Sequence, residues 1–189
     1  MSAIQVRPAA GELLVASVGL DGNFFEQTVI LLLDCDSSGA LGVVLNKLAD
    51  AELAEVLPQW QQMVSPPQRL FAGGPVSPNG AVCVAKVNND AEDPPGWRRV
   101  VDDLGLLHLD TPVEIAEGAY SDLRIFAGYS GWESGQLEGE ILRGDWHRAA
   151  VREGDIFGSD QSTLWRRVLR RQQGPVSLNS AWVSDPEVN

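Results

Sequence analysis

Residues that commonly carry chemistry are scarce in this sequence. Its 189 residues include only two histidines and two cysteines, and neither pair has a spacing typical of metal ligands. Cys83 lies in an apolar run and is interpreted as a small core residue, whereas two aspartates flank Cys35 and disfavour its thiolate form. We therefore expect no metal site, no reactive thiol and no disulfide framework.

Motifs for cofactors and membranes are also missing. The sequence has neither a phosphate loop of the Walker type nor a Gly-x-Gly-x-x-Gly fingerprint, so we expect no cofactor. Its N-terminal segment lacks the basic start, long apolar stretch and cleavage site of an export signal. No apolar run approaches the length that crosses a bilayer. These features predict a cytoplasmic protein without membrane contact.

Positive charge is in short supply. There are 14 basic residues against 26 acidic ones, which gives a net charge of −12. A surface of that sign repels phosphate backbones, so the sequence argues against direct nucleic-acid binding. The exception is a set of arginines towards the C-terminus, made up of Arg143, Arg148, Arg152, Arg166, Arg167, Arg170 and Arg171. A solvated helix face is favoured over an anion site as its interpretation.

The apolar content of 44% and charged content of 21% are typical of a soluble globular protein. Apolar segments at residues 13–17, 28–35 and 40–46 predict three early strands, and the DSSG between the last two predicts a hairpin. The unbroken run VILLL predicts a strand covered on both faces. Strands mixed with a few helices, without βαβ regularity, predict an α+β single domain. We expect a mostly antiparallel sheet or open β-barrel flanked by short helices.

Helices are expected over residues 50–60, 135–143 and 159–172, from the spacing of their apolar residues. Asp50 and Ser134 are expected to act as N-caps of the first two. In the third, one apolar face is predicted to consist of Leu164, Trp165, Val168 and Leu169.

The stretch GYSGWESGQLEGE, residues 128–140, is the least ordinary part of the chain. It is interpreted as a strand that enters a glycine-rich turn before a helix, whose free N–H groups favour an anion or a polar ligand group. It partly matches the nucleophile elbow of hydrolases, but Trp132 stands where the second glycine is needed. Glu138 and Glu140 are two residues apart on the expected helix, so they point in different directions and are interpreted as solvated. A hydrolase that uses Ser130 or Glu138 remains an alternative.

Four motifs, taken together and in this order, resemble the YqgE/AlgH family of bacterial proteins. They are GELLVAS near the start, GVVLNK, FAGGPV and the stretch over residues 128–140. The resemblance implies a compact α+β fold with a barrel-like sheet over residues 11–173, between an arm of residues 1–10 and a polar tail of residues 174–189. Some members carry the name of a transcriptional regulator of alginate production. The family usually has Ala at the position of Ser130, which further weakens this serine as a nucleophile.

No catalytic residue is assigned. The sequence favours a non-enzymatic regulatory or binding module for an unknown small ligand or protein partner. Its site is predicted where the GGPV and GYSGW segments approach each other, because binding residues often lie in turns. The predicted binding residues are Asn46, Gly73, Gly74, Tyr129, Trp132, Gln136 and Glu138.

Overall fold

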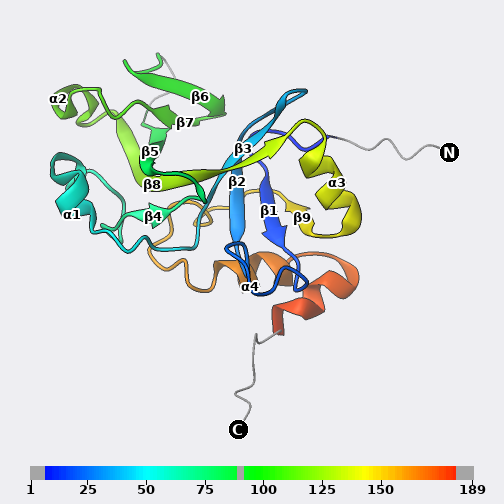
Figure 1. Cartoon of the computed structure of the whole chain (residues 1–189). Helices are drawn as coiled ribbons and strands as arrows, with labels where there is room; N and C mark the ends of the chain where they lie inside the picture. The colour runs from blue at the N-terminus through cyan, green and yellow to red at the C-terminus, as the bar shows by residue number, and fades with distance from the viewer. Residues whose placement is uncertain (1–6, 89–91, 182–189) are drawn as a thin grey trace, which may run out of the picture.

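A curled sheet forms the centre of the computed structural model, which describes residues 7–88 and 92–181 (Figure 1). The sheet has nine strands in the order β6-β7-β5-β8-β3-β2-β1-β9, and β4 pairs with β8 beside this path. Every strand pair is antiparallel except β4 with β8. Short helices lie against both halves of the sheet. The predicted α+β class with a mostly antiparallel sheet is therefore confirmed.

The strands are β1 Leu13–Ala16, β2 Val29–Asp36, β3 Gly39–Val44, β4 Phe71–Ala72, β5 Val76–Val87, β6 Trp97–Val101, β7 Leu104–Leu107, β8 Tyr120–Glu133 and β9 Trp146–Ala149. The α-helices are α1 Leu53–Val56, α2 Val113–Ala116, α3 Gln136–Arg143 and α4 Leu164–Arg170, and the 3-10 helices are η1 Pro58–Trp60 and η2 Gly174–Ala181. Parts of the predicted arm and tail, residues 1–6 and 182–189, lie outside the described residues.

The first half of the sheet, formed by β3, β2, β1 and β9, is covered on both faces. Along β1, Leu13 and Val15 join one buried cluster, whereas Leu14 and Ala16 join another on the opposite face. Successive side chains of a strand point to opposite faces, so an unbroken apolar run needs two covering layers. The same division in β2 confirms the prediction made from VILLL.

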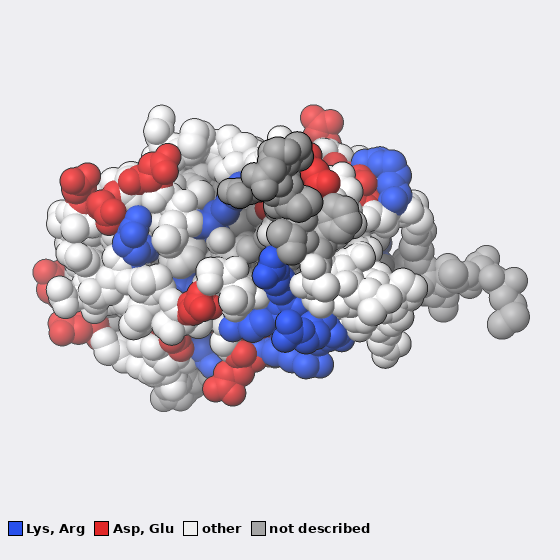
Figure 2. Space-filling model, turned by 90° about the horizontal axis from the view of Figure 1, so that it is seen from below, with Lys and Arg blue, Asp and Glu red and all other residues white. Residues whose placement is uncertain are grey.

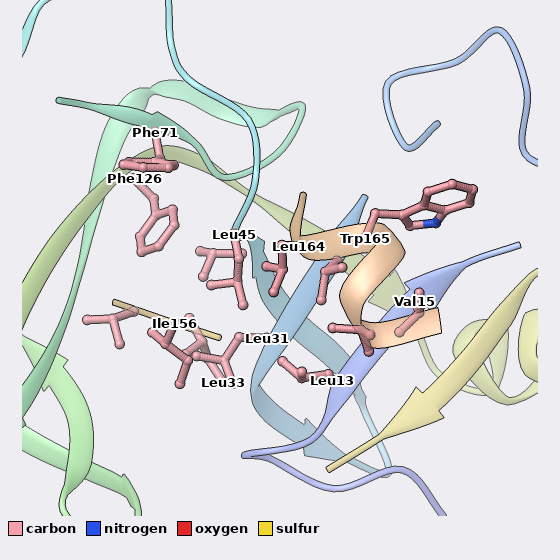
Figure 3. Close-up of a cluster of buried hydrophobic side chains, with 14 of the residues drawn as sticks. Leu13, Val15, Leu31, Leu33, Leu45, Phe71, Phe126, Ile156, Leu164 and Trp165 are labelled. Atoms are coloured by element: carbon pink, nitrogen blue, oxygen red, sulfur yellow. The ribbon is translucent and has the colours of Figure 1, made fainter. Parts of the chain in front are cut away.

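Helix α4 covers one of these faces with the apolar side that the sequence predicts. Leu164, Trp165, Val168 and Leu169 are each at most 2% exposed. Figure 3 shows Leu164 and Trp165 among side chains of β1 and β2. The indole N–H of Trp165 also donates to the Ala16 carbonyl at 2.8 Å, which fixes the helix against β1.

The second half of the sheet has a core of its own. Leu53 of α1, Trp60 of η1 and Ala116 of α2 pack with buried residues of β5, β7 and β8. Figure 1 shows α1 and α2 at the far side of the molecule from α3 and β9. Helices α1 and α2 have only four residues each, so their position depends on packing rather than on helix propensity.

Strand β8 joins the two halves. Its first part pairs with β5, up to Ala127 and again at Tyr129, and its last part, Ser130 to Glu133, pairs with β3. Gly128 lies at the irregularity between Ala127 and Tyr129 with φ +68, a conformation that L side chains rarely adopt. The segment GYSGW is therefore a strand that changes partners, and the expectation of a turn there was wrong. The turn comes later, at Ser134 and Gly135.

Both predicted N-caps were also wrong. The N-cap of α1 is Glu52, whose side chain makes no capping bond, and α1 ends at Val56 before Pro58. Gly135 is the N-cap of α3, because the Ser134 hydroxyl donates instead to the carbonyl of Ser37 at 2.7 Å. Tertiary contacts outcompeted the local capping bonds that the sequence suggested.

Candidate functional site

The GGPV and GYSGW segments do meet, but they meet through backbone contact. A Cβ atom on Gly74 would lie 2.1 Å from the carbonyl carbon and oxygen of Tyr129, and one on Gly73 would lie 2.4 Å from the Gly128 oxygen. The Gly73 N–H donates to the Ala127 carbonyl at 2.8 Å. Glycine is therefore needed here for close backbone approach, and the contact leaves no space for a ligand between the two segments.

Asn46 holds two neighbouring chain segments together. Its side-chain oxygen accepts the N–H of Val29 at 2.9 Å, and its amide nitrogen donates to the Gln27 carbonyl at 2.8 Å. Both polar ends of the side chain are thus used within the fold. These bonds continue the β2–β3 pairing beyond the end of β3. The side chain of Asn46 therefore bonds to the segment before β2, although its backbone neighbours Val44 and Lys47 bond to Gly73 and Ala72.

A carboxylate joins Trp132 and Gln136 to β9. One oxygen of Glu140 accepts the indole N–H groups of Trp132 and Trp146, at 2.8 and 2.9 Å, and the other accepts the amide of Gln136 at 3.0 Å. The two indole rings meet edge to face with centroids 6.1 Å apart. Bonds to a charged acceptor are stronger than neutral ones. Glu140 is therefore a structural residue, and its interpretation as a solvated glutamate was wrong.

Glu138 points elsewhere, as the helical spacing predicted. Its side chain is 29% exposed and lies 4.0 Å from the Nε atom of Arg7.

Trp132 also borders a small hollow of about 210 Å³ beside the β2–β3 hairpin. The other residues that line this hollow are Asp34, Asp36, Ser38, Gly39, Ala40 and Leu41. Of the predicted set, the structure thus brings Gly73, Gly74 and Tyr129 together in one place and Trp132 with Gln136 in another.

Groups that could act as nucleophiles or bases are poorly placed for catalysis. Ser130 is fully buried, and its hydroxyl donates to the Gly73 carbonyl at 3.1 Å. Burial raises the pKa of the Cys83 thiol; for Cys35, burial is the largest cause of a raised pKa, followed by the charge of Glu138. Burial lowers the pKa of His147. Over the described ranges, no three His, Cys, Asp or Glu residues form a group that could hold a metal ion.

Arg124 is a buried cation that the sequence analysis did not single out. It is 0% exposed, and its guanidinium donates to the carbonyls of Pro66 and Ile156, each at 2.7 Å, and of Gly158. The group also lies 4.5 Å from the centre of the Phe71 ring. Desolvation lowers its pKa to about 10. These contacts tie β8 to two loops, and a single arginine inside a strand gives no sequence signal of that role.

A second, larger hollow lies on the second half of the sheet, away from the glycine motifs. It measures about 590 Å³ and opens to solvent where the β5–β7 ladder ends at the Cys83–Leu107 pair. Its lining residues are Leu57, Ala81, Val82, Cys83, Gly96, Arg98, Leu106, Leu107, His108, Leu109 and Asp110. Most of them are apolar, and three carry polar ionisable side chains, namely Arg98, His108 and Asp110. The sequence analysis missed this site because its residues come from four separate segments.

Arg98 is the polar group of this hollow that has no carboxylate partner. It is exposed on β6 and forms no ion pair with any residue in the described part of the chain. Its neighbour Arg99 differs, because its Nη2 lies 2.6 Å from Asp93. Nearby, Nδ1 of His108 lies 3.5 Å from a carboxylate oxygen of Asp110. The hollow thus combines an apolar floor with a guanidinium that has no ion-pair partner among the residues that the structure describes.

Comparison with known proteins identifies the family. A family model described as AlgH-like (DUF179) matches residues 13–177, which include every strand of the sheet. The chain belongs to the AlgH-like family. The resemblance read from the four motifs is thereby confirmed, together with the fold that it implied.

Relatives of this AlgH-like chain match over nearly their whole length. The UPF0301 protein SCO2948 of Streptomyces coelicolor is 42% identical over 188 residues, which cover 98% of this chain and 97% of the relative. The UPF0301 protein Rv0038 of Mycobacterium tuberculosis is 41% identical over 174 residues, with 91% and 86% covered. These names state no activity, substrate or partner.

Two solved structures share the fold of this AlgH-like chain. The crystal structure of protein DIP2367 from Corynebacterium diphtheriae is 31% identical, with a TM-score of 0.84 and 93% of each chain covered. The solution structure of the AlgH protein from Pseudomonas aeruginosa is 24% identical, with a TM-score of 0.67, covering 98% of this chain and 100% of that one. At that identity the second likeness shows the fold alone.

Proposed function

We propose that this protein is a non-enzymatic binding module, and that its ligand or partner segment carries an apolar group next to an acid group. The observation that carries the proposal is the hollow of about 590 Å³ between α1 and strands β5 to β7. Binding sites for small molecules are mostly apolar hollows of this size with a few polar groups that fix orientation. A regulatory role would follow if binding there governs contact with another protein.

The apolar part of the ligand is expected to rest on the floor of the hollow. Leu106 and Val82 are only partly buried and line it directly. Covering such side chains removes apolar surface from water, which contributes about 25 cal/mol for each Å² buried. Because the hollow opens to solvent along one side, it suits a chain end or side chain of a larger partner as well as a free small molecule.

Arg98 is expected to bind the acid group. A guanidinium offers a planar fork of donors that matches a carboxylate, and this one forms no ion pair within the described residues. Asp110, which lines the same hollow, lies 3.5 Å from His108 instead. In the Arg98–Leu106 pair of β6 and β7, the two residues lie opposite each other, so their side chains share one face of the sheet. The ligand is therefore expected to place its charge within a few ångströms of its apolar group.

A fluorescent probe with this chemistry tests the proposal. Anilinonaphthalene sulfonate joins an apolar ring system to an anion, and its emission rises when it enters an apolar site. We expect the native protein to bind it, and Arg98→Gln to weaken binding roughly fivefold, as for one partly exposed ion pair. Arg99→Gln is the matched control, since its guanidinium already pairs with Asp93. Equal binding by all three proteins, or none by the parent, would overturn the assignment.

Unfolded or loosened protein also binds this probe, so each variant needs a check of its packing. Near-ultraviolet circular dichroism reports the fixed environment of the tryptophans. The comparison is valid where the variant spectrum equals that of the parent.

The residues singled out by the sequence stay a second, predicted binding site. The hollow of about 210 Å³ beside Trp132 is the observation that favours it. There Gln136→Ala tests a contact to a ligand, and a variant that folds normally and keeps every binding property of the parent would contradict it. The cytoplasmic location and the absence of nucleic-acid contact stay predictions of the sequence; no helix in the described ranges is long and apolar enough to cross a membrane.

A further inference from the structure

Helix α4 carries an exposed arginine face that its packing role does not use. Arg166, Arg167 and Arg170 are all exposed, while the opposite side of the same helix is buried in the core. At 100° per residue, the three arginines fall within about 100° of arc, and they span about 6 Å along the axis. Figure 2, which views the molecule from the α4 side, shows a contiguous patch of basic atoms there.

The three arginines differ from the fourth arginine of the same run. Arg171 binds Asp155, a carboxylate that is only 3% exposed, with Nη2 2.6 Å from its oxygen. Arg166 and Arg170 form no ion pair with a described carboxylate. Arg167 makes a weak contact of 3.4 Å with the Gln161 amide oxygen, and its charge acts on the nearby Asp160 without forming an ion pair. One guanidinium of the run is therefore structural, and three are available to solvent.

The helix dipole favours Arg167 and Arg170, which lie in the last turn of α4, but it does not explain Arg166. Arg166 is the third residue of α4, near the positive end of the helix dipole, where a cation is unfavourable. It also faces Arg170 one turn away, and like charges at that spacing repel each other. In a chain with net charge −12, an acidic or neutral residue could stand at either place without loss of packing.

We propose that this face, Arg166, Arg167 and Arg170, docks an acidic segment of a partner protein. Guanidinium forks pair with carboxylates in two parallel hydrogen bonds, and three of them within one helical turn match two or three carboxylates on a short segment. A nucleic acid suits the face less well, because its affinity depends on many phosphate contacts along an extended chain. Beyond this small patch, the field of the acidic protein would repel such a polyanion.

The face is separate from the hollow of the proposed function. Helix α4 packs on β1 and β2, whereas the hollow lies beside α1, β5 and β7. The two sites can therefore be tested independently, and failure of one leaves the other standing.

Fluorescence anisotropy with a labelled, glutamate-rich short peptide tests the proposal. The parent is expected to bind this peptide, to bind it less tightly as salt rises, and to bind the glutamine counterpart far less. The double variant Arg166→Glu with Arg170→Glu is expected to weaken binding by roughly tenfold or more. Its matched control, Lys86→Glu with Arg143→Glu, changes the net charge equally at two residues whose charges already pair with Asp103 and Asp145. It is expected to bind as the parent does.

Three results would overturn the proposal. They are no binding by the parent, equal weakening in both double variants, or tighter binding of a labelled DNA oligonucleotide than of the peptide. Tighter binding of the oligonucleotide would show that the face binds a nucleic acid and not an acidic protein segment. Since Arg166 and Arg170 are exposed, the variants are expected to melt within a few degrees of the parent, and Arg166→Gln with Arg170→Gln repeats the test without introduced repulsion.

Discussion

At the scale of single residues, short contact distances explain why the GGPV and GYSGW segments need glycine. Gly74 lies against the backbone of Tyr129 and Ser130, which cannot move as the end of a side chain can. Gly139 of α3 is different, since the nearest atom to an added Cβ would be a terminal nitrogen of the flexible Arg143 side chain at 3.7 Å. The same substitution should therefore have opposite effects at the two positions.

We predict that Gly74→Ala lowers the free energy of unfolding by about 3 kcal/mol or more, because the new methyl group forces the segment between β4 and β5 away from β8. Gly139→Ala should raise it by about 0.5–1 kcal/mol, through the entropy that glycine loses in a helix. Urea denaturation measures both. Equal effects, or a neutral Gly74→Ala, would contradict the close approach of the two motifs.

Glu140 shows the same dependence on neighbours. Its carboxylate accepts the indole N–H groups of Trp132 and Trp146, both of which are less than a tenth exposed. Removing a shared acceptor leaves both donors without a partner. Glu138, two residues earlier, forms a single ion pair within the described residues, a 4.0 Å contact with the exposed Arg7.

We predict that Glu140→Ala destabilises the protein by about 3 kcal/mol, the cost of leaving buried donors unsatisfied. Glu138→Ala should change stability by less than about 0.5 kcal/mol. Chemical denaturation followed by tryptophan fluorescence measures the difference directly. If the two variants are equally stable, the role given to Glu140 is wrong.

At the scale of elements, the sequence predicted strands better than it predicted turns and caps. The apolar runs of β1, β2 and β3 determine their own burial, since each residue type suits a covered strand. GYSGW was misjudged because glycines usually mark turns, whereas here they let β8 pass close to Gly73 and Gly74 and change partners. Such a close approach depends on a segment more than fifty residues away, which local patterns do not reveal.

Strand β9 supplies a test that depends on pH. His147 pairs with Val15 of β1, and burial lowers its pKa below the ordinary value of 6.5. The unfolded chain therefore binds a proton at higher pH than the folded chain does. As pH falls through about 6.5, this difference reduces the stability of the fold until His147 is protonated in the folded state as well.

We predict that the free energy of unfolding of His147→Gln falls less steeply than that of the parent as pH is lowered from about 7 towards 5. Urea titrations across this range measure the slopes. A parent and a His147→Gln variant with the same slope would show that burial does not perturb this histidine.

At the scale of the whole molecule, the site is the least predictable feature from sequence. The hollow beside β5 and β7 is formed by segments around residues 57, 81–83, 96–98 and 106–110, and no local motif connects them. By contrast, the arginine run was visible in the sequence, but only the burial of Asp155 separates the structural Arg171 from the exposed arginines. Both the hollow and the structural role of Arg171 therefore depend on contacts between segments that are far apart in the sequence, which residue types alone do not reveal.

The central claim is that the hollow, and not the glycine motifs, receives an amphipathic anion. Titration of the nitrogen-15-labelled protein with octanoate, followed by amide chemical shifts, tests it most directly. We predict that the shifts concentrate at Cys83, Leu106 and His108, and that Arg98→Gln reduces them. Shifts centred on Trp132 and Gln136 would move the site to the motifs, and the absence of any shift would contradict the claim altogether.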